Sequence, residues 1–277
     1  MFNQKITTLP FVLFIAFMFA FTACDSPLDT GSDGDTGTME VMLHDAPGDY
    51  QEVNVFIERV EVNNTADEDT GWIELSSPNQ SYDLLELTNG NMVQLGVAEL
   101  EAGTYEQVRL ILSEEGHNVV LDGEAHDMFV PSGEQTGVKL NVDAEIQPGI
   151  TYTLLLDFDA HRSVVVRGTE QSGIEYLLKP VIRATDEAIT GNIAGTVEPA
   201  DSEPFVYAIQ GDDTLSTSIP ETTDGSFMLV GLEEGSYTVS VDHDELEAED
   251  ITDVQVEVGE STDIGTITLN GDEEGDE

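Results

Sequence analysis

The alternation of apolar and polar residues with a period of two is the feature that most constrains the fold of this 277-residue chain. Successive side chains of a β-strand point to opposite faces, so this alternation is typical of strands buried on one face. The period of 3.6 residues that marks amphipathic helices is almost absent after Met39. We therefore predict an all-β fold. The clearest alternating runs are Val53, Val55 and Ile57; Val108, Leu110 and Leu112; Tyr152, Leu154, Leu156 and Phe158; and Tyr237, Val239 and Val241.

Two local features refine this prediction. The apolar positions change phase between Ile57 and Val60, as if one residue had been inserted, which predicts a β-bulge near Glu58 and Arg59. A short helix over residues 97–100 is the one helical element that we expect in the folded part.

The chain is long enough for two domains, and turn dipeptides such as Asn89-Gly90 recur at the spacing of antiparallel sandwiches. We predict two antiparallel β-sandwiches, a larger N-terminal one and a smaller C-terminal one. The boundary falls near Glu187, Ala188 and Ile189, because the basic residues stop at Arg183 and residues 189–277 hold 24 acidic residues and no Lys or Arg. The predicted segments are a signal peptide at 1–23, an acidic flexible tether at 24–38, sandwiches at 39–187 and 190–270, and an acidic tail at 271–277.

The N-terminal segment predicts export and lipid anchoring. An unbroken apolar run from Phe11 to Phe21 has the length of a signal-peptide core and is too short to span a bilayer. The only cysteine, Cys24, follows Thr22 and Ala23 and precedes a polar linker, which resembles the bacterial lipobox. We expect Cys24 to be lipidated, so that the protein contacts the membrane through its anchor.

Charge excludes one class of partner and indicates a habitat. The 57 acidic residues outnumber the 8 basic ones, giving a formal net charge of -49. Such a chain cannot present the positive face that nucleic acid requires, so no nucleic-acid partner is expected. The composition is 39% hydrophobic, enough for a folded protein rather than a disordered acidic chain. Surface acidity of this extent favours a salt-adapted, halophilic bacterium.

The larger predicted sandwich resembles the family known as domain of unknown function (DUF) 4382, found in prokaryotic lipoproteins. Its first stretch ends a strand with Leu43, His44, Asp45, Ala46 and Pro47. The resemblance implies a secreted β-sandwich and no established activity. The stretches that carry it are 43–47, 53–60, 82–87, 103–110, 130–139, 156–160 and 178–180.

The smaller predicted sandwich is similar to the carboxypeptidase regulatory-like modules, which are transthyretin-like, that is prealbumin-like or Ig-like, sandwiches. The similarity lies in residues 193–197, 206–208, 223–229, 231–239 and 258–265. Despite the family's name, it implies no peptidase residues. Such modules share their architecture with carbohydrate-binding-like folds.

The most notable cluster of candidate ligands is acidic. Asp157 and Asp159 are two residues apart and lie on one face at the end of a predicted strand, opposite Leu156 and Phe158. Together with Asp45 they form a candidate calcium site built of oxygen ligands. Alternatively, one of the two is a glycosidase acid. The third interpretation is structural: these acids face solvent or pair with the few basic residues, and we expect ion pairs at Arg109, Lys139 and Lys179.

Histidines and aromatic residues give weaker indications. The five histidines are His44, His117, His126, His161 and His243. They show no metal-binding spacing, so we expect them at surface or turn positions. Trp72 and the tyrosines are candidates for a sugar-binding platform, although most tyrosines of a sandwich protein pack in cores or in cross-strand pairs.

These features predict a non-enzymatic, lipid-anchored protein of the cell envelope that acts in binding, adhesion or spacing. We expect it at the outer membrane or cell surface, because an acidic segment behind the lipidated cysteine resembles the export signal of surface lipoproteins. Its expected partner is an extracellular glycan or an envelope protein, and no cofactor other than calcium is expected. The first alternative is a carbohydrate-binding accessory lipoprotein. The second is a glycoside hydrolase that uses Asp157 or Asp159.

The charge predicts how stability responds to salt. At about 1 M salt the Debye length shrinks to about 3 Å, which screens the repulsion among exposed carboxylates. We expect the melting temperature to rise strongly between dilute buffer and molar NaCl, as measured by circular dichroism. A flat response would contradict salt adaptation.

Overall fold

The computed structural model describes residues 36–46, 48, 50–65, 70–131, 137–169 and 173–271. Contacts divide the chain into a unit of residues Met1–Asp33 and a compact unit of residues Gly34–Glu277. The predicted signal peptide, most of the tether, Cys24 and residues 272–277 lie outside the described residues. The two sandwiches described below both belong to the second unit.

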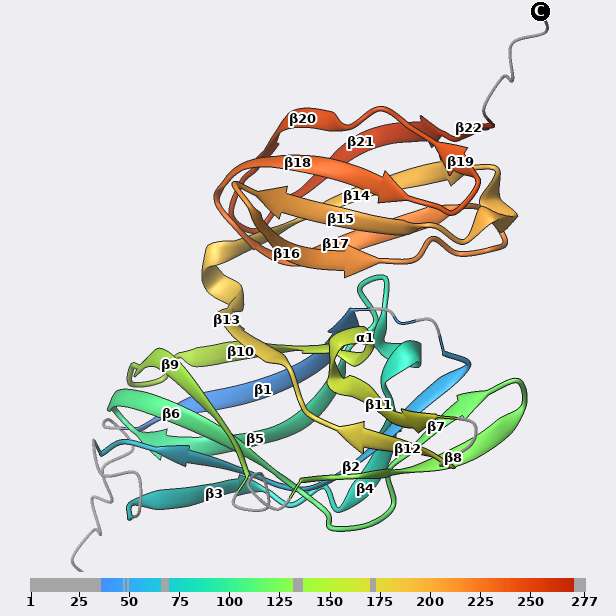
Figure 1. Ribbon diagram of the computed structural model, residues 1–277. Coiled ribbons are helices and arrows are strands. Elements are labelled where there is room, and N and C mark those ends of the chain that lie inside the picture. Colours follow the sequence, from blue (N-terminus) through green and yellow to red (C-terminus); the bar gives the residue numbers. More distant parts are fainter. Residues whose placement is uncertain are drawn as a thin grey trace, which may run out of the picture. The chain divides into compact units, whose positions relative to one another are not determined.

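The first sandwich packs a four-stranded sheet against a nine-stranded sheet (Figure 1). The four-stranded sheet has the order β13 (Ile182–Asp186), β10 (Thr151–Asp159), β1 (Thr36–Ala46) and β5 (Val93–Glu101). The nine-stranded sheet runs β11 (Val164–Thr169), β12 (Gly173–Leu178), β8 (Glu124–Phe129), β7 (Asn118–Leu121), β2 (Glu52–Asn63), β6 (Gly103–Leu112) and β9 (Val138–Ile146), with β3 (Trp72–Ser76) and β4 (Gln80–Asp83) also paired to β2. Two short helical turns, η1 (Leu84–Leu87) and α1 (Ala160–Ser163), complete it.

The second sandwich has a three-stranded and a four-stranded sheet. The first has the order β17 (Ser226–Glu233), β14 (Thr190–Glu198) and β21 (Ser261–Thr268). The second has the order β16 (Asp213–Ser218), β15 (Phe205–Gln210), β18 (Gly235–Asp242) and β20 (Ile251–Val256). The short strands β19 (Leu246–Glu247) and β22 (Asn270–Gly271) pair with each other, and η2 (Glu187–Ile189) and η3 (Ala200–Ser202) are single turns.

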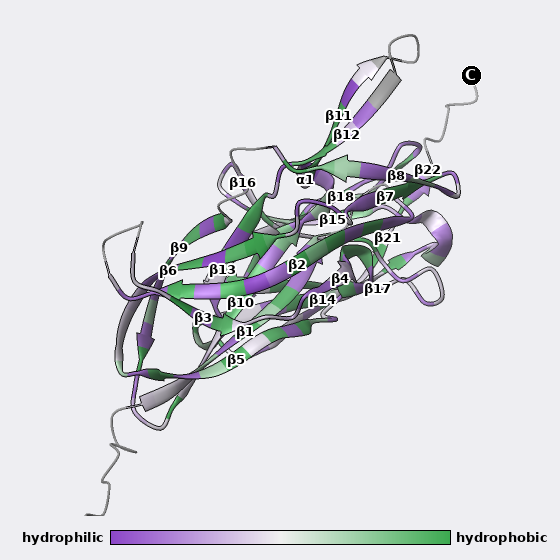
Figure 2. Ribbon diagram, turned by 90° about the horizontal axis from the view of Figure 1, so that it is seen from below, coloured by the Kyte–Doolittle hydropathy of each residue, from purple (hydrophilic) through white to green (hydrophobic). Residues whose placement is uncertain are grey.

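Each sandwich has its own hydrophobic core, as the alternation predicted. In the first core, Leu110 and Leu156 are fully buried, and in the second Val206 and Val239 are buried. Apolar and polar residues alternate along single strands in Figure 2. The prediction of an all-β protein built of β-sandwiches is confirmed.

A tyrosine anchors the same hairpin corner in both cores. The sequences LEAGTY and LEEGSY, at 100–105 and 232–237, join β5 to β6 and β17 to β18. Tyr105 is buried and its hydroxyl donates to the Glu101 carbonyl at 3.1 Å, while the buried Tyr237 donates to the Glu233 carbonyl at 2.9 Å. Each ring fills the core while its polar tip is satisfied locally. The expectation that tyrosines serve mainly in packing holds for both residues.

The sheets are mixed rather than purely antiparallel. β1 pairs with β10 in parallel, and so do β14 with β21 and β12 with β8. Parallel neighbours need a long connection, and β1 and β10 are separated by eight strands of the chain. Alternation within one strand does not encode the direction of its partner, so these parallel pairs could not be predicted from it.

The structure confirms one local prediction and overturns another. The register of β2 against β6 shifts between Ile57 and Arg59, so the predicted bulge lies at Glu58. The helix predicted over 97–100 is wrong, because these residues belong to β5. That segment pairs with β1, with Val97 opposite Glu40 and Leu100 opposite Gly37, and sheet pairing outweighs the weak local helical preference.

Two histidines were misplaced by the sequence analysis. His44 and His117 are 2% and 1% exposed, respectively, rather than at the surface. His117 Nδ1 accepts the backbone N–H of Phe56 at 3.0 Å, and Nε2 lies 2.8 Å from the Ser113 carbonyl, to which it donates. The ring therefore bridges β2 and the loop after β6 in its neutral form. Burial lowers the pKa of His117, and the hydrogen bond to Ser113 partly offsets this effect.

This bridge predicts a pH-dependent contribution to stability. His117→Gln should lower the free energy of unfolding at pH 7 by about 1–3 kcal/mol. The partly buried Phe56 N–H and Ser113 carbonyl would lose their hydrogen bonds to the imidazole ring. Below pH 6.5, His117 binds a proton more readily in the unfolded chain than in the folded protein. The contribution of His117 to the stability of the wild type therefore falls as the pH falls. The deficit of His117→Gln should therefore shrink between pH 7 and pH 5, measured by urea unfolding in molar salt. The exposed His161→Gln variant serves as the control, and a pH-independent deficit would contradict the assignment.

Candidate functional site

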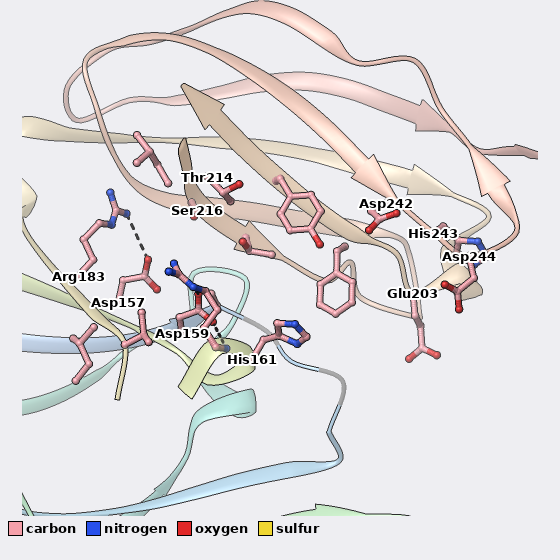
Figure 3. A pocket seen from close by; sticks show the side chains of 18 of the residues that line it. Asp157, Asp159, His161, Arg183, Glu203, Thr214, Ser216, Asp242, His243 and Asp244 are labelled. Atoms are coloured by element: carbon pink, nitrogen blue, oxygen red, sulfur yellow. Dashed lines mark hydrogen bonds and ion pairs between the residues drawn. The ribbon is translucent and has the colours of Figure 1, made fainter. Parts of the chain in front are cut away.

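A row of three polar side chains crosses the outer face of the four-stranded sheet. The pairing registers place His44 of β1 opposite Asp157 of β10, and Asp157 opposite Arg183 of β13. His44 Nδ1 lies 3.8 Å from Asp157 Oδ1, and Arg183 Nη2 lies 3.5 Å from Asp157 Oδ2 (Figure 3). Because alternate residues of β10 such as Leu156 and Phe158 point into the first core, Asp157 points away from it. We call these three residues the polar row.

The polar row lies beneath the second sandwich, with His44 and Asp157 buried and Arg183 half-buried. Arg183 Nη2 donates to the Gly231 carbonyl of β17 at 3.2 Å. Gly231 has a φ of 66°, and a Cβ there would lie 3.6 Å from Arg183 Nη2 and 3.8 Å from His44 Nε2. Burial lowers the pKa of His44, while the charge of Asp157 raises it and that of Arg183 lowers it further. The ring is thus held in its neutral form close to an ion pair.

Asp45 and Asp159 flank this row and hold the start of α1. Asp45 is 4% exposed, and its Oδ1 accepts the Ala160 N–H at 2.9 Å. Asp159 Oδ1 accepts the Arg162 N–H at 2.8 Å, and its Oδ2 lies 3.8 Å from Arg162 Nε. Burial raises the pKa of Asp45 well above its usual range and also raises that of Asp159. Both carboxylates therefore have local partners on the protein backbone.

A pocket of about 790 Å³ opens next to the polar row. Its walls come from both sandwiches: Asp157, Asp159 and Arg183 lie on one side (Figure 3), and Phe205 and Tyr207 come from the other sandwich. We call it the junction pocket. Its further charged and histidine lining residues are His161, Arg162, Glu203, Asp242, His243, Asp244 and Glu245.

Two aromatic rings form part of the wall of the junction pocket. Phe205 and Tyr207 lie two residues apart on β15, while the intervening Val206 points into the second core. The rings are nearly parallel, with an interplanar angle of 15° and centroids 6.1 Å apart. His161 of α1 approaches Phe205 from the first sandwich, with ring centroids 5.9 Å apart. We call Phe205 and Tyr207 the aromatic platform.

A turn of the first sandwich clamps the second one. Asn89 has a φ of 55°, in the left-handed region that Asn tolerates. Its Nδ2 donates to the Ile219 carbonyl at 2.9 Å and to Glu221 Oε1 at 3.2 Å. Its Oδ1 accepts from the hydroxyl of Ser218 and from the Met228 N–H. The Asn89-Gly90 dipeptide was predicted only as a turn, and its docking role was not anticipated.

The sequence placed three candidate calcium ligands in one region, and the structure gives each of them other contacts. Asp157 faces Arg183, whereas Asp45 and Asp159 bind backbone N–H groups of α1. Within the described ranges no group of three or more His, Cys, Asp or Glu side chains is arranged to hold a metal ion. The calcium site stays a prediction, and the observed contacts favour the structural interpretation.

The residues expected to form ion pairs lie in different surroundings. Arg109 Nε lies 2.5 Å from Glu61 Oε2, and its guanidinium carbon lies 4.1 Å from the centre of the Trp72 ring. Lys139 lies opposite Arg109 in the β6–β9 pairing. Lys179 is exposed at the end of β12, and in the part of the chain that the structure describes it forms no ion pair. Since Arg109 covers one face of Trp72, that ring is a poor candidate for a sugar platform.

Sequence reasoning missed the roles of His44, Arg183 and Phe205 in the site. His44 was expected at the surface or in a turn, although it lies at the end of an alternating strand and on the face opposite Leu43. Phe205 and Tyr207 flank Val206, so their alternation was a usable sign that they point away from a core. Nothing local in the sequence showed that this outward face would line a pocket.

The fold and site define an all-β protein of two sandwiches with a pocket where they meet. The chain belongs to the family described as "Domain of unknown function (DUF4382)", which matches residues 36–180, just over half of the chain. No protein of curated function matches it. Among the residues that the structure describes, no helix is long and apolar enough to cross a membrane.

Solved structures give only remote similarity. The Bacillus anthracis TIE protein is 15% identical, with 85% of this chain covered and a TM-score of 0.22, and the chain spans about a third (34%) of that protein's length. The minor pilin GBS52 of Streptococcus agalactiae is 9% identical, with 86% of this chain and 99% of that one covered and a TM-score of 0.23. The major pilin subunit BcpA of Bacillus cereus is 10% identical, with 85% and 99% covered and a TM-score of 0.21. Scores this low carry no functional argument.

Asp157→Ala tests the role of the polar row. Removing this carboxylate leaves Arg183 facing His44 without its counter-ion, so we expect the free energy of unfolding to fall by about 1–3 kcal/mol. Asp244→Ala, at an exposed position of the junction pocket, is the matched control and should change stability by less than about 0.5 kcal/mol. Adding millimolar CaCl₂ to the wild type distinguishes a structural role of Asp157 from a calcium-binding one. An unchanged melting temperature fits the structural role, and a calcium-dependent rise that Asp157→Ala abolishes would establish the metal site instead.

Proposed function

We propose that the protein is a non-enzymatic, exported lipoprotein of the cell envelope that binds a ligand in the junction pocket. The observation that carries the binding role is the pocket itself, because its walls are contributed by two separate sandwiches and combine aromatic rings with charged groups. Concave sites with an apolar wall and a few polar groups are the usual form of ligand sites, and they occur preferentially at domain interfaces.

The contacts of the acidic residues support a binding rather than a catalytic role. A glycosidase needs one carboxyl group free to donate a proton and a second one to act as base or nucleophile. Asp157 is engaged by Arg183, and Asp159 holds the first turn of α1 and faces Arg162. Both carboxylates thus have structural tasks that compete with acid–base work.

Anchoring through Cys24 places this binding role at the envelope. The apolar run ending at Phe21, the small residues before Cys24 and the acidic tether after it support lipidation and display at the outer membrane or cell surface. The tether would let the folded unit extend from the membrane, as a binding, adhesion or spacer module requires.

We further infer that residues 39–187 and 190–270 are separate modules, the second of them carboxypeptidase regulatory-like. Two hydrophobic cores that share no residue support this division. The contacts of Asn89 and Arg183 with the second core's strands explain why the two sandwiches nevertheless form one compact unit.

The carbohydrate-binding alternative is the second candidate, and the aromatic platform is the observation that favours it. The sequence suggested Trp72 and the tyrosines for that role. Among them Tyr207, together with Phe205, fits it better than Trp72 because both line a pocket.

Lipid labelling and surface labelling test the proposed function. In a bacterial host that processes lipoproteins, the wild type should incorporate an alkyne-tagged fatty acid, fractionate with membranes and be digested by protease added to intact cells. Cys24→Ser should lose the label and the membrane association while keeping the fold. A wild-type protein that remains unlabelled or protected from protease would overturn the envelope assignment.

A further inference from the structure

We propose that the junction pocket binds a neutral saccharide, with one sugar ring stacked on the aromatic platform of Phe205 and Tyr207. This inference rests on the proposed binding function and specifies its ligand class. It stands on two features of the pocket: the geometry of the two rings and the mixture of donors and acceptors around them.

The platform presents the apolar surface that sugar stacking requires. Because Val206 and Ala208 fill the second core, the alternating Phe205 and Tyr207 side chains must lie on the pocket side of β15. Their nearly parallel rings present apolar surface to the pocket along the strand. The C–H groups on one face of a pyranose ring also form an apolar surface, which is removed from water on stacking.

The polar groups around the platform suit hydroxyl groups. Asp159, Glu203 and Asp242 line the pocket and accept hydrogen bonds, while Arg162 and Arg183 donate them. Figure 3 shows Asp242 and Glu203 on the side of the second sandwich and Asp159 and Arg183 on the side of the first. A sugar hydroxyl both donates and accepts, so it can satisfy groups of both kinds at once.

Charge argues for a neutral ligand over a cationic one. Arg183 lies 3.5 Å from Asp157, and Arg162 lies 3.8 Å from Asp159, so the carboxylates of the inner wall already face cations. A second cation would be repelled by the same guanidinium groups. At about molar salt, attraction to the exposed acids of the rim is also screened beyond about 3 Å. Stacking and hydrogen bonding are weakened less by molar salt than long-range electrostatic attraction is.

An oligosaccharide array tests this inference. The full chain carrying Cys24→Ser is applied in 1 M NaCl to neutral cello-, xylo-, manno- and N-acetylchito-oligosaccharides, with de-N-acetylated chito-oligosaccharides as cationic probes. Retention of at least one neutral series is expected. Phe205→Ala should weaken that binding about tenfold or more, since it removes half of the stacking surface.

Phe129→Ala is the matched control, because Phe129 is 59% exposed on β8 and does not line the pocket. It should bind as the parent does. Glu203→Gln, at an exposed position in the pocket, provides a second variant that does not touch a core, and it should weaken binding without changing the melting temperature.

Three results would overturn the inference: an array with no retained neutral sugar, retention of only the de-N-acetylated probes, or equal losses in Phe205→Ala and Phe129→Ala. The first two leave the lipid and protease labelling results unaffected, so failure of the saccharide assignment is distinguishable from failure of the proposed envelope function.

Discussion

The parallel pairing of β1 with β10 is the constraint on which the rest of the molecule depends. It joins an early strand to a late one and puts Met39, Val41 and Leu43 into the first core beside Leu154, Leu156 and Phe158. Because side chains alternate, the same register brings His44 next to Asp157 on the opposite face, and the pairing with β13 adds Arg183. One ladder therefore creates a dry interior on one side and the polar row on the other.

Scarce basic residues stabilise an acidic chain at a few sites. The seven Lys and Arg residues that follow the signal segment lie between Arg59 and Arg183. Arg59 and Arg109 both face Glu61, which is 9% exposed, so two cations offset one carboxylate that has lost its water. Arg183 does the same for Asp157. Exposed ion pairs contribute little to stability, whereas a buried carboxylate without a counter-ion is costly, so these three cations lie where they offset the desolvation of Glu61 and Asp157.

The sequence predicts local structure better than it predicts long-range contacts. The alternation of apolar residues predicted the strands, and its change of phase located the bulge at Glu58, because both are properties of a single segment. The 97–100 segment was misjudged since its state is set by pairing with β1, not by its own composition. The pocket depends on residues such as Asp159 and Tyr207, whose proximity follows from registers and from the docking of two sandwiches. No single segment encodes those relations, so the site emerged only from the structure.

The same contacts that hold the two sandwiches together also shape the pocket. Asp157 orients Arg183, and Arg183 in turn donates to the Gly231 carbonyl of the second sandwich while lining the pocket. Asn89 fixes a second point of contact through Ile219 and Met228. Two such points restrict rotation as well as separation, which holds the aromatic platform at a defined distance from Asp159 and His161. A site built across a junction is preorganised only if that junction is rigid. The ion pair of Asp157 and Arg183 helps to make it rigid, which is a role beyond the small net contribution of such a pair to stability.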